Sequence, residues 1–109
     1  MKQIQIIGNV GEKPTLQKLN DNIFSLKFSV AVSNSYKDKE GKEVEETDWF
    51  TCFRYFKTEP IELMKFFKKG LKVFVQGKPS FSVTNGKNVV YVNKTIQVSI
   101  LEVLTLKKK

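Results

Sequence analysis

The chain has 109 residues and a mass of 12.6 kDa, the size of one compact domain. It has 19 Lys and Arg against 11 Asp and Glu, a formal net charge of +8, which favours a polyanionic partner: nucleic acid, an acidic membrane surface or an acidic protein. It contains no His and one cysteine, Cys52, which excludes Ser-His-Asp and Cys-His catalysis, His-based metal sites, thiolate zinc clusters and an internal disulfide.

The apolar residues are too scattered for export or membrane insertion. Residues 1–8 have no apolar core of signal-peptide length, and no run approaches the roughly 20 apolar residues that span a bilayer. The basic residues are spread over strands rather than along an amphipathic helix, which disfavours a membrane surface. We therefore expect a cytoplasmic protein with no membrane contact.

Alternating side chains predict strands along most of the chain. Residues 2–7 alternate weakly, and residues 22–33 alternate cleanly, as in a long strand with one buried face. Residues 34–47 are polar and predict a long hairpin loop, in which the segment 38–48 carries a net charge of −4 and leaves +12 on the rest of the chain. This acidic segment predicts a solvated hairpin; the alternatives are contact with a neighbouring subunit's lysines and weak competition with a nucleic acid.

The next predicted strand, residues 48–57, is rich in aromatic residues. Alternation gives one face Trp49, Thr51, Phe53, Tyr55 and Lys57, and gives the other face Phe50, Cys52, Arg54 and Phe56. Because both faces are largely apolar, we expect one of them to meet a partner rather than water.

A single helix of about three turns is predicted next, with Thr58 as its N-cap and Gly70 at its C-terminal end. Strands resume over 71–77, 80–84, 89–92 and 95–104, and Asn85-Gly86 predicts a tight hairpin turn. This order predicts an all-β fold, a five-stranded OB-fold Greek-key barrel with one short helix between strands 3 and 4. Small barrels of other types fit the same pattern.

Four stretches resemble signatures of bacterial single-stranded DNA-binding proteins, and they keep the family's order over about residues 3–104. They are residues 6–14 (IIGNVGEKP), 28–39 (FSVAVSNSYKDK), 47–52 (TDWFTC) and 67–77 (FKKGLKVFVQG). The resemblance implies an OB-fold that assembles as a homotetramer and coats single-stranded DNA in DNA replication, repair and recombination. It also implies no enzymatic activity, no cofactor and no metal, in a cytoplasmic protein associated with the bacterial nucleoid.

The resemblance also implies site residues. Tyr36, Trp49 and Tyr55 match the family's base-stacking aromatics, and Phe53 is a further stacking candidate, with core or subunit packing as its alternative. The lysines matched to the phosphate path, together with one neighbouring candidate, are Lys39, Lys57, Lys68, Lys69 and Lys72. Aromatic platforms and mobile positive charges suit a single strand of any sequence, whereas the guanine-reading residue Arg occurs once, as Arg54.

The chain departs from the family's pattern in four places: at residues 80–84, at Thr51, at Arg54 and at the C-terminal end. Residues 80–84 lack the usual basic residues and aromatic, and Phe81 substitutes only if the register shifts by one. The family's acidic C-terminal tail is absent, so we expect one binding domain, residues 1–106, with a basic end, residues 107–109. Partner recruitment through such a tail is therefore doubtful.

The sequence also admits two rival functions. The first is a primosomal OB-fold protein that binds single-stranded DNA as a dimer and assists replication restart. The second, a metal nuclease, is disfavoured because Asp21, Asp38 and Asp48 are the only aspartates and most acids crowd one segment. Single-stranded RNA is expected to be at most a weaker ligand than DNA.

Overall fold

Strands dominate the computed structural model, which describes residues 2–12, 14–87 and 90–104. The elements in chain order are β1 (Ile4–Val10), β2 (Thr15–Asn20), β3 (Ile23–Lys37), β4 (Glu43–Phe56), α1 (Ile61–Met64), β5 (Lys72–Asn85) and β6 (Val90–Val103). The predicted basic end, residues 107–109, and its boundary at residue 106 lie outside the described residues. Among the residues described, no helix is long and apolar enough to cross a membrane.

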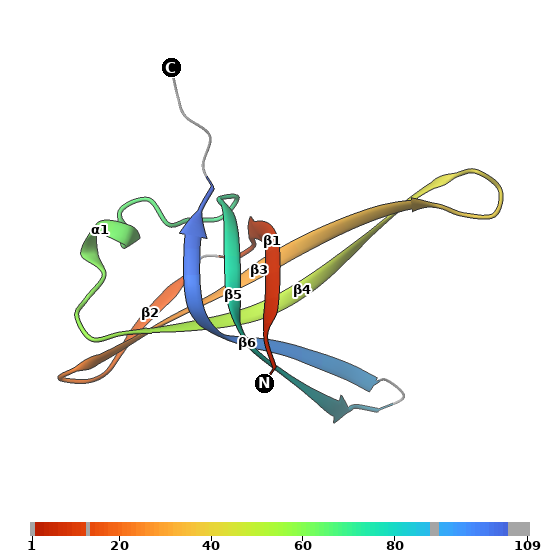
Figure 1. Cartoon of the computed structure of the whole chain (residues 1–109). Coiled ribbons are helices and arrows are strands. Elements are labelled where there is room, and N and C mark those ends of the chain that lie inside the picture. Colours follow the sequence, from red (N-terminus) through yellow and green to blue (C-terminus); the bar gives the residue numbers. More distant parts are fainter. Residues whose placement is uncertain (1, 13, 88–89, 105–109) are drawn as a thin grey trace, which may run out of the picture.

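Five strands close into a barrel in the order β1-β5-β6-β4-β3, and β3 returns to β1 through Asn9–Ala31 and Val10–Val30 (Figure 1). β2 pairs with the first part of the same strand, β3, from Ile23 to Lys27. β1 and β2 thus act as two halves of one interrupted strand, and α1 falls between the third and fourth strands of the barrel. The predicted all-β OB-fold barrel is confirmed.

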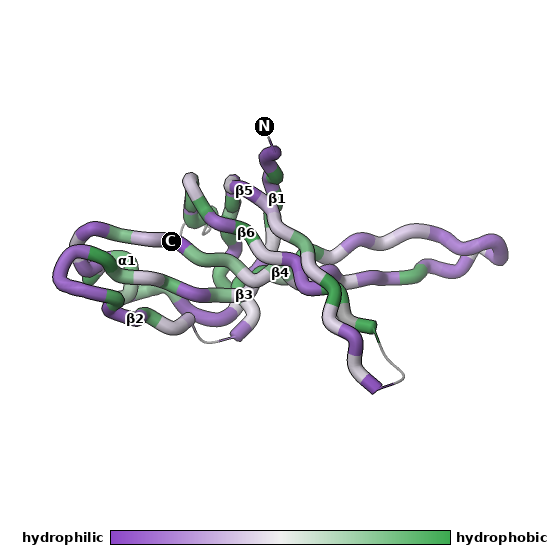
Figure 2. The backbone as a smooth tube through the Cα atoms, turned by 90° about the horizontal axis from the view of Figure 1, so that it is seen from below, coloured by the Kyte–Doolittle hydropathy of each residue, from purple (hydrophilic) through white to green (hydrophobic). Residues whose placement is uncertain are grey.

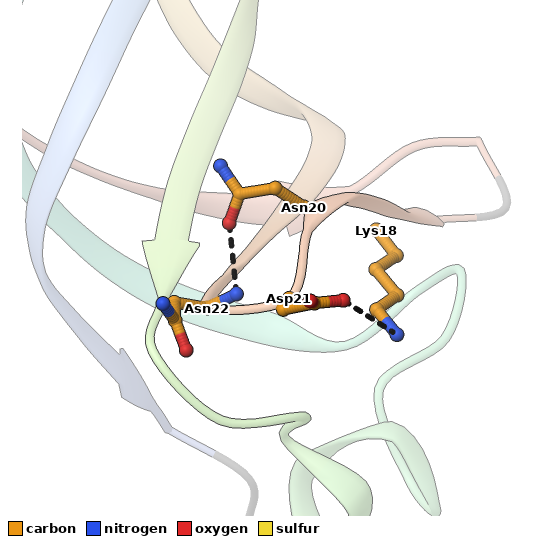
Figure 3. A network of polar contacts seen from close by, with 4 residues as sticks. All are labelled: Lys18, Asn20, Asp21 and Asn22. Atoms are coloured by element: carbon orange, nitrogen blue, oxygen red, sulfur yellow. Dashed lines mark hydrogen bonds and ion pairs between the residues drawn. The ribbon is translucent and has the colours of Figure 1, made fainter.

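The sequence pattern missed β2 because the segment Thr15–Asn20 is almost entirely exposed and shows no apolar alternation. A turn holds it against β3 (Figure 3): Asn20 Oδ1 accepts a hydrogen bond from the Asn22 backbone N–H at 2.8 Å, and Lys18 pairs with Asp21 at 4.0 Å. β2 is therefore stabilised by local turn interactions and strand pairing rather than by burial of its side chains.

Barrel closure depends on glycines where two backbones meet. A Cβ at Gly8 in β1 would collide with the Ala31 carbonyl oxygen and lie 2.8 Å from Val30 Cγ1. A Cβ at Gly77 would collide with the Gln97 carbonyl oxygen, where the β5–β6 register shifts between Gln76 and Gly77. These two positions let β1 and β5 bend closely around their neighbours.

The core is filled by the inward side chain of every second strand residue. Its fully buried members include Leu26, Val30, Cys52, Val73, Val75 and Ile96. Phe67 closes one end of the barrel, and its ring meets that of Phe28 edge-on with 5.0 Å between centroids.

The predicted three-turn helix is wrong in its length and its cap. α1 has four residues, begins after Pro60 rather than Thr58, and has no side-chain cap. The backbone N–H groups of Lys65 and Phe66 bond three residues back, to Glu62 and Leu63, so the helix tightens and ends. We attribute the early end to Phe67, whose burial in the core turns the chain inward.

The predicted loop over residues 34–47 is also wrong, because β3 and β4 stay paired out to Lys37–Glu43. The turn is stabilised by Asp38 Oδ1, which accepts the backbone N–H groups of Glu40 and Lys42 at 2.9 and 2.8 Å, and by Gly41 at φ +81°. Beyond Ala31 and Trp49 these strands pair only with each other, so residues 32–48 form a two-stranded extension, the β3–β4 arm.

A second extension, the β5–β6 arm, comprises residues 78–94. The strands predicted separately at 71–77 and 80–84 are one strand, β5, and those predicted at 89–92 and 95–104 are one strand, β6, although Val89 itself is not described. The predicted hairpin is confirmed by pairing out to Asn85–Val90, but the predicted two-residue turn at Asn85-Gly86 is wrong, because Asn85 belongs to β5 and pairs with Val90. Figure 1 shows the two arms leaving the barrel and diverging.

Candidate nucleic-acid interface

The outward face of β4 presents aromatic side chains to solvent. Trp49 is 52% exposed and Tyr55 is 48% exposed, while Phe53 between them is partly exposed. The alternate residues Phe50 and Cys52 point into the core. β4 lies between β3 and β6, so the aromatic row runs along the middle of a curved sheet. The predicted division of this strand into two faces is confirmed.

Trp49 is positioned by a glycine. A Cβ at Gly11 would collide with the indole ring and lie 2.7 Å from Ser29 Oγ, so only glycine lets Trp49 settle against the backbone here. Ser29 holds this segment in place, because its carbonyl accepts the Gly11 N–H at 2.8 Å and its Oγ accepts the Glu12 N–H at 3.1 Å. Ala31, which is opposite Trp49 on β3, is small. The indole is therefore held at one edge and open over half its surface.

Two hollows follow one another along this face. The first, of about 470 Å³, lies at the Trp49 end and is lined by Glu12, Thr15, Lys27, Phe28, Ser29, Trp49 and Thr51. The second, of about 880 Å³, lies at the Tyr55 end and is lined by Lys2, Phe53, Tyr55, Lys78, Pro79, Ser80, Phe81, Thr95 and Gln97. Together they form a track with an aromatic residue at each end.

Three lysines that the sequence did not predict as phosphate contacts line this track: Lys2, Lys27 and Lys78. Lys27 lines the first hollow, and its Nζ lies 5.9 Å from the centre of the ring of Phe53, which lines the second. The alternation of residues 22–33 already placed Lys27 on the outward face, but its pairing with Phe53 depends on the β3–β4 register.

The predicted lysines lie mostly elsewhere. Lys57 follows β4 and lines a smaller apolar hollow with Leu19, Ile23, Tyr55 and Phe56. The other four predicted lysines are exposed and line none of these hollows. Lys39 lies at the tip of the β3–β4 arm, Lys68 and Lys69 lie between α1 and β5, and Lys72 lies opposite Asn9 at the start of β5. Their contact with phosphate stays a prediction.

Tyr36 is about half exposed, but it is not part of the aromatic row. It pairs with Val44 on the β3–β4 arm. Strand alternation places Tyr36 on the face continuous with the buried Val30, whereas Trp49 lies on the opposite, outward face. The structure thus brings together Trp49, Phe53 and Tyr55 but leaves Tyr36 on a different surface.

The remaining reactive groups of the site region serve the fold. Burial raises the pKa of the Cys52 thiol to about 12, so at neutral pH it is a protonated, unreactive group. Arg54 donates to the backbone carbonyl of Ser99 at 2.6 Å and links β4 to β6. Within the described ranges, no group of three or more His, Cys, Asp or Glu side chains could hold a metal ion. The arrangement suits binding by stacking and charge rather than catalysis.

The chain is similar to known single-stranded DNA-binding proteins. The model of the single-strand binding protein family matches residues 1–105. The chain is 31% identical over 78 residues to single-stranded DNA-binding protein 1 of Xylella fastidiosa, covering 71% of this chain and 57% of the relative. It is 28% identical over 88 residues to the single-stranded DNA-binding protein of Neisseria meningitidis serogroup A, covering 81% and 50%. The chain spans about half the length of the curated relatives it matches.

Solved structures resemble the fold over nearly its whole length. The small single-stranded DNA-binding protein of Streptomyces coelicolor superposes with a TM-score of 0.72 at 22% identity, covering 93% of this chain and 92% of that one. The Plasmodium falciparum SSB in complex with ssDNA superposes with a TM-score of 0.75 at 26% identity, covering 96% of each chain. With a family match over 105 of its 109 residues, the chain belongs to the single-strand binding protein family.

Proposed function

We propose that the protein binds single-stranded DNA without sequence preference, along the outward face of β4. The observation that carries this proposal is the row Trp49, Phe53 and Tyr55, which is bordered by two hollows lined with lysines. The family membership and the similarity to an SSB solved with ssDNA support it. Residues 1–106 would act as one binding domain.

The row suits single strands because a duplex hides its base faces. Unstacked bases can lie on Trp49 and Tyr55, and each such stack contributes about 1–3 kcal/mol whatever the base. Lys27 and the lysines at the Tyr55 end neutralise phosphates as mobile point charges. Arg54, the chain's only arginine and so its only guanidinium group for a guanine edge, is held by backbone carbonyls.

Coating of single strands in replication, repair and recombination follows as the biological role, in the bacterial cytoplasm near the nucleoid. We expect DNA to be preferred to RNA. Recruitment of further proteins through an acidic tail is not part of the proposal.

Assembly as a homotetramer is part of the proposal. The outward face of β1, β5 and β6 carries Ile7, Phe74 and Ile100 on neighbouring strands, and Ile7 and Ile100 are exposed. This apolar face is suited to contact between subunits. Light scattering would give four subunits; a mass of two subunits would instead favour the primosomal alternative.

The proposal is tested by fluorescence anisotropy of a labelled oligo(dT). We expect binding at low salt, much weaker binding of a duplex of the same length, and a log–log salt slope of about −0.7 for each phosphate neutralised. Equal affinity for duplex and single strand, or no binding at low salt, would refute it.

A further inference from the structure

The β5–β6 arm has an apolar face that covers nothing within its own chain. Strand alternation makes this face continuous with the buried Ile96, but the arm extends past the barrel and has no core beneath it. Its side chains Phe81, Val83, Val90 and Val92 are therefore 58, 62, 63 and 57% exposed. A contiguous exposed apolar face of this kind indicates contact with another macromolecule.

The proposed DNA track does not account for this face. The opposite face of the arm is polar: Asn93 Nδ2 donates to Thr84 Oγ1 at 2.9 Å, and Thr95 lies opposite Thr51 of β4. That polar face continues the outward face of β4. Phe81 also borders the hollow at Tyr55, so the inference rests on Val83, Val90 and Val92, which are aliphatic and offer no aromatic surface to a base.

The β3–β4 arm has a matching face. Tyr36 and Val44 form an apolar pair on it, and strand alternation places Glu46 and Asp48 on the same side. Residues 32–48 contain six acids and three lysines, a net charge of −3, whereas residues 78–94 contain three lysines and no acid, a net charge of +3. In Figure 2 the outer part of the β3–β4 arm is mostly hydrophilic, while the β5–β6 arm carries hydrophobic segments towards its end.

The two arms already attract each other where they leave the barrel. Lys94 Nζ of the β5–β6 arm pairs with Asp48 Oδ1 of the β3–β4 arm at 3.2 Å, and it also lies 5.4 Å from the centre of the Phe50 ring. Beyond this point the arms diverge (Figure 1), so the outer parts of their apolar faces do not meet within one chain.

We propose that the β5–β6 arm of one copy packs against the β3–β4 arm of a second copy. Val83 and Val92 of one copy would contact Tyr36 and Val44 of the other, and Lys87 near the end of the first arm would face the acids of the second. The contact is small, so it is weak between free copies. It strengthens when copies are held close together, as on one nucleic-acid strand, by effective concentration.

The first test is disulfide cross-linking without DNA at low salt. A Val44→Cys protein mixed with a Val83→Cys protein should give a disulfide-linked pair on oxidation, and high salt should suppress it. The native thiol of Cys52 is buried and does not interfere. The matched control is Ser82→Cys, one residue along on the opposite face of the arm, which should not link to Val44→Cys.

Charge exchange tests the electrostatic part. Glu46→Lys in the Val44→Cys chain, or Lys87→Glu in the Val83→Cys chain, should each reduce the cross-link yield severalfold against wild-type charge. The yield should recover when the two charge variants are mixed. An equal yield from Ser82→Cys, or no link at any salt concentration, overturns the proposal.

A third variant separates this contact from DNA binding. Val83→Ser with Val92→Ser should abolish the cross-link formed by a further cysteine on the same face of the arm, Asn85→Cys in the same chain, and should leave the affinity for a short oligo(dT) unchanged. If the double variant instead weakens oligo(dT) binding and keeps the link, the face binds nucleic acid and the proposal fails.

Discussion

Replacing Trp49 with alanine is expected to weaken oligo(dT) binding by about 5- to 150-fold. This loss corresponds to a stacking free energy of about 1–3 kcal/mol for one aromatic residue. Trp49 is the largest side chain of the row, and Gly11 fixes its orientation. An indole already held in place loses little conformational freedom when a base stacks on it. Trp49→Phe keeps a ring at this position and should lose much less affinity than Trp49→Ala.

The matched control is Phe66→Ala. Phe66 is an aromatic residue of similar exposure, at 47%, but it lies between α1 and β5 and lines none of the hollows described. Its removal should leave the affinity nearly unchanged. Equal losses from Trp49→Ala and Phe66→Ala would show that the outward face of β4 is not the binding surface. Unfolding curves of both variants would show whether a loss reflects the fold instead.

Replacing Leu26 with alanine is expected to lower the free energy of unfolding by about 2–5 kcal/mol, the usual cost of removing a fully buried leucine side chain. Leu26 is 0% exposed and lies on β3, which pairs with β1, β2 and β4. A cavity here cannot easily collapse, because the strands around it are fixed by their backbone pairing on both sides.

Leu19→Ala is the control for this prediction, since Leu19 on β2 is 48% exposed. It should change the free energy of unfolding by no more than about 0.5 kcal/mol. Urea unfolding at one fixed protein concentration is the measurement, because assembly makes stability depend on concentration. Similar losses in the two variants would contradict the assigned core.

Strict alternation explains why the barrel and the face of β4 were predictable. A side-chain period of two separates Trp49, Phe53 and Tyr55 from Phe50 and Cys52 without any knowledge of the fold. Which of the two apolar faces is buried was not fixed by alternation. That choice depends on barrel closure, in which Gly8 and Gly77 let the strands curve inward on one side.

The errors in the secondary structure have two physical origins. Pairing continues wherever backbone hydrogen bonds are satisfied, and it requires no apolar pattern. Polar residues 15–20, 34–37 and 43–47 are in strands for this reason, although their composition is typical of loops. The helix was overestimated because Phe66 and Phe67 fit a helical stripe, whereas the structure buries Phe67 and exposes Phe66.

The lysines were the least predictable part of the candidate site. A lysine can be placed along a phosphate path only when the neighbouring strands are known. Lys2, which precedes β1, and Lys78, which lies in β5, come together at the Tyr55 end only because the strands pair as they do. Lys27 was on the correct predicted face, but no sequence signal links it to Phe53.

The intrinsic fluorescence of Trp49 reports directly on whether a strand binds along the outward face of β4, because Trp49 is the chain's only tryptophan and lies on the proposed track. Titration with oligo(dT) at low salt should quench this fluorescence strongly and saturate, as a base stacks on the indole, while a duplex of equal length should quench it much less. Fluorescence that stays unchanged while the oligonucleotide binds would show that the strand takes another path, and the account of the outward face of β4 would be wrong.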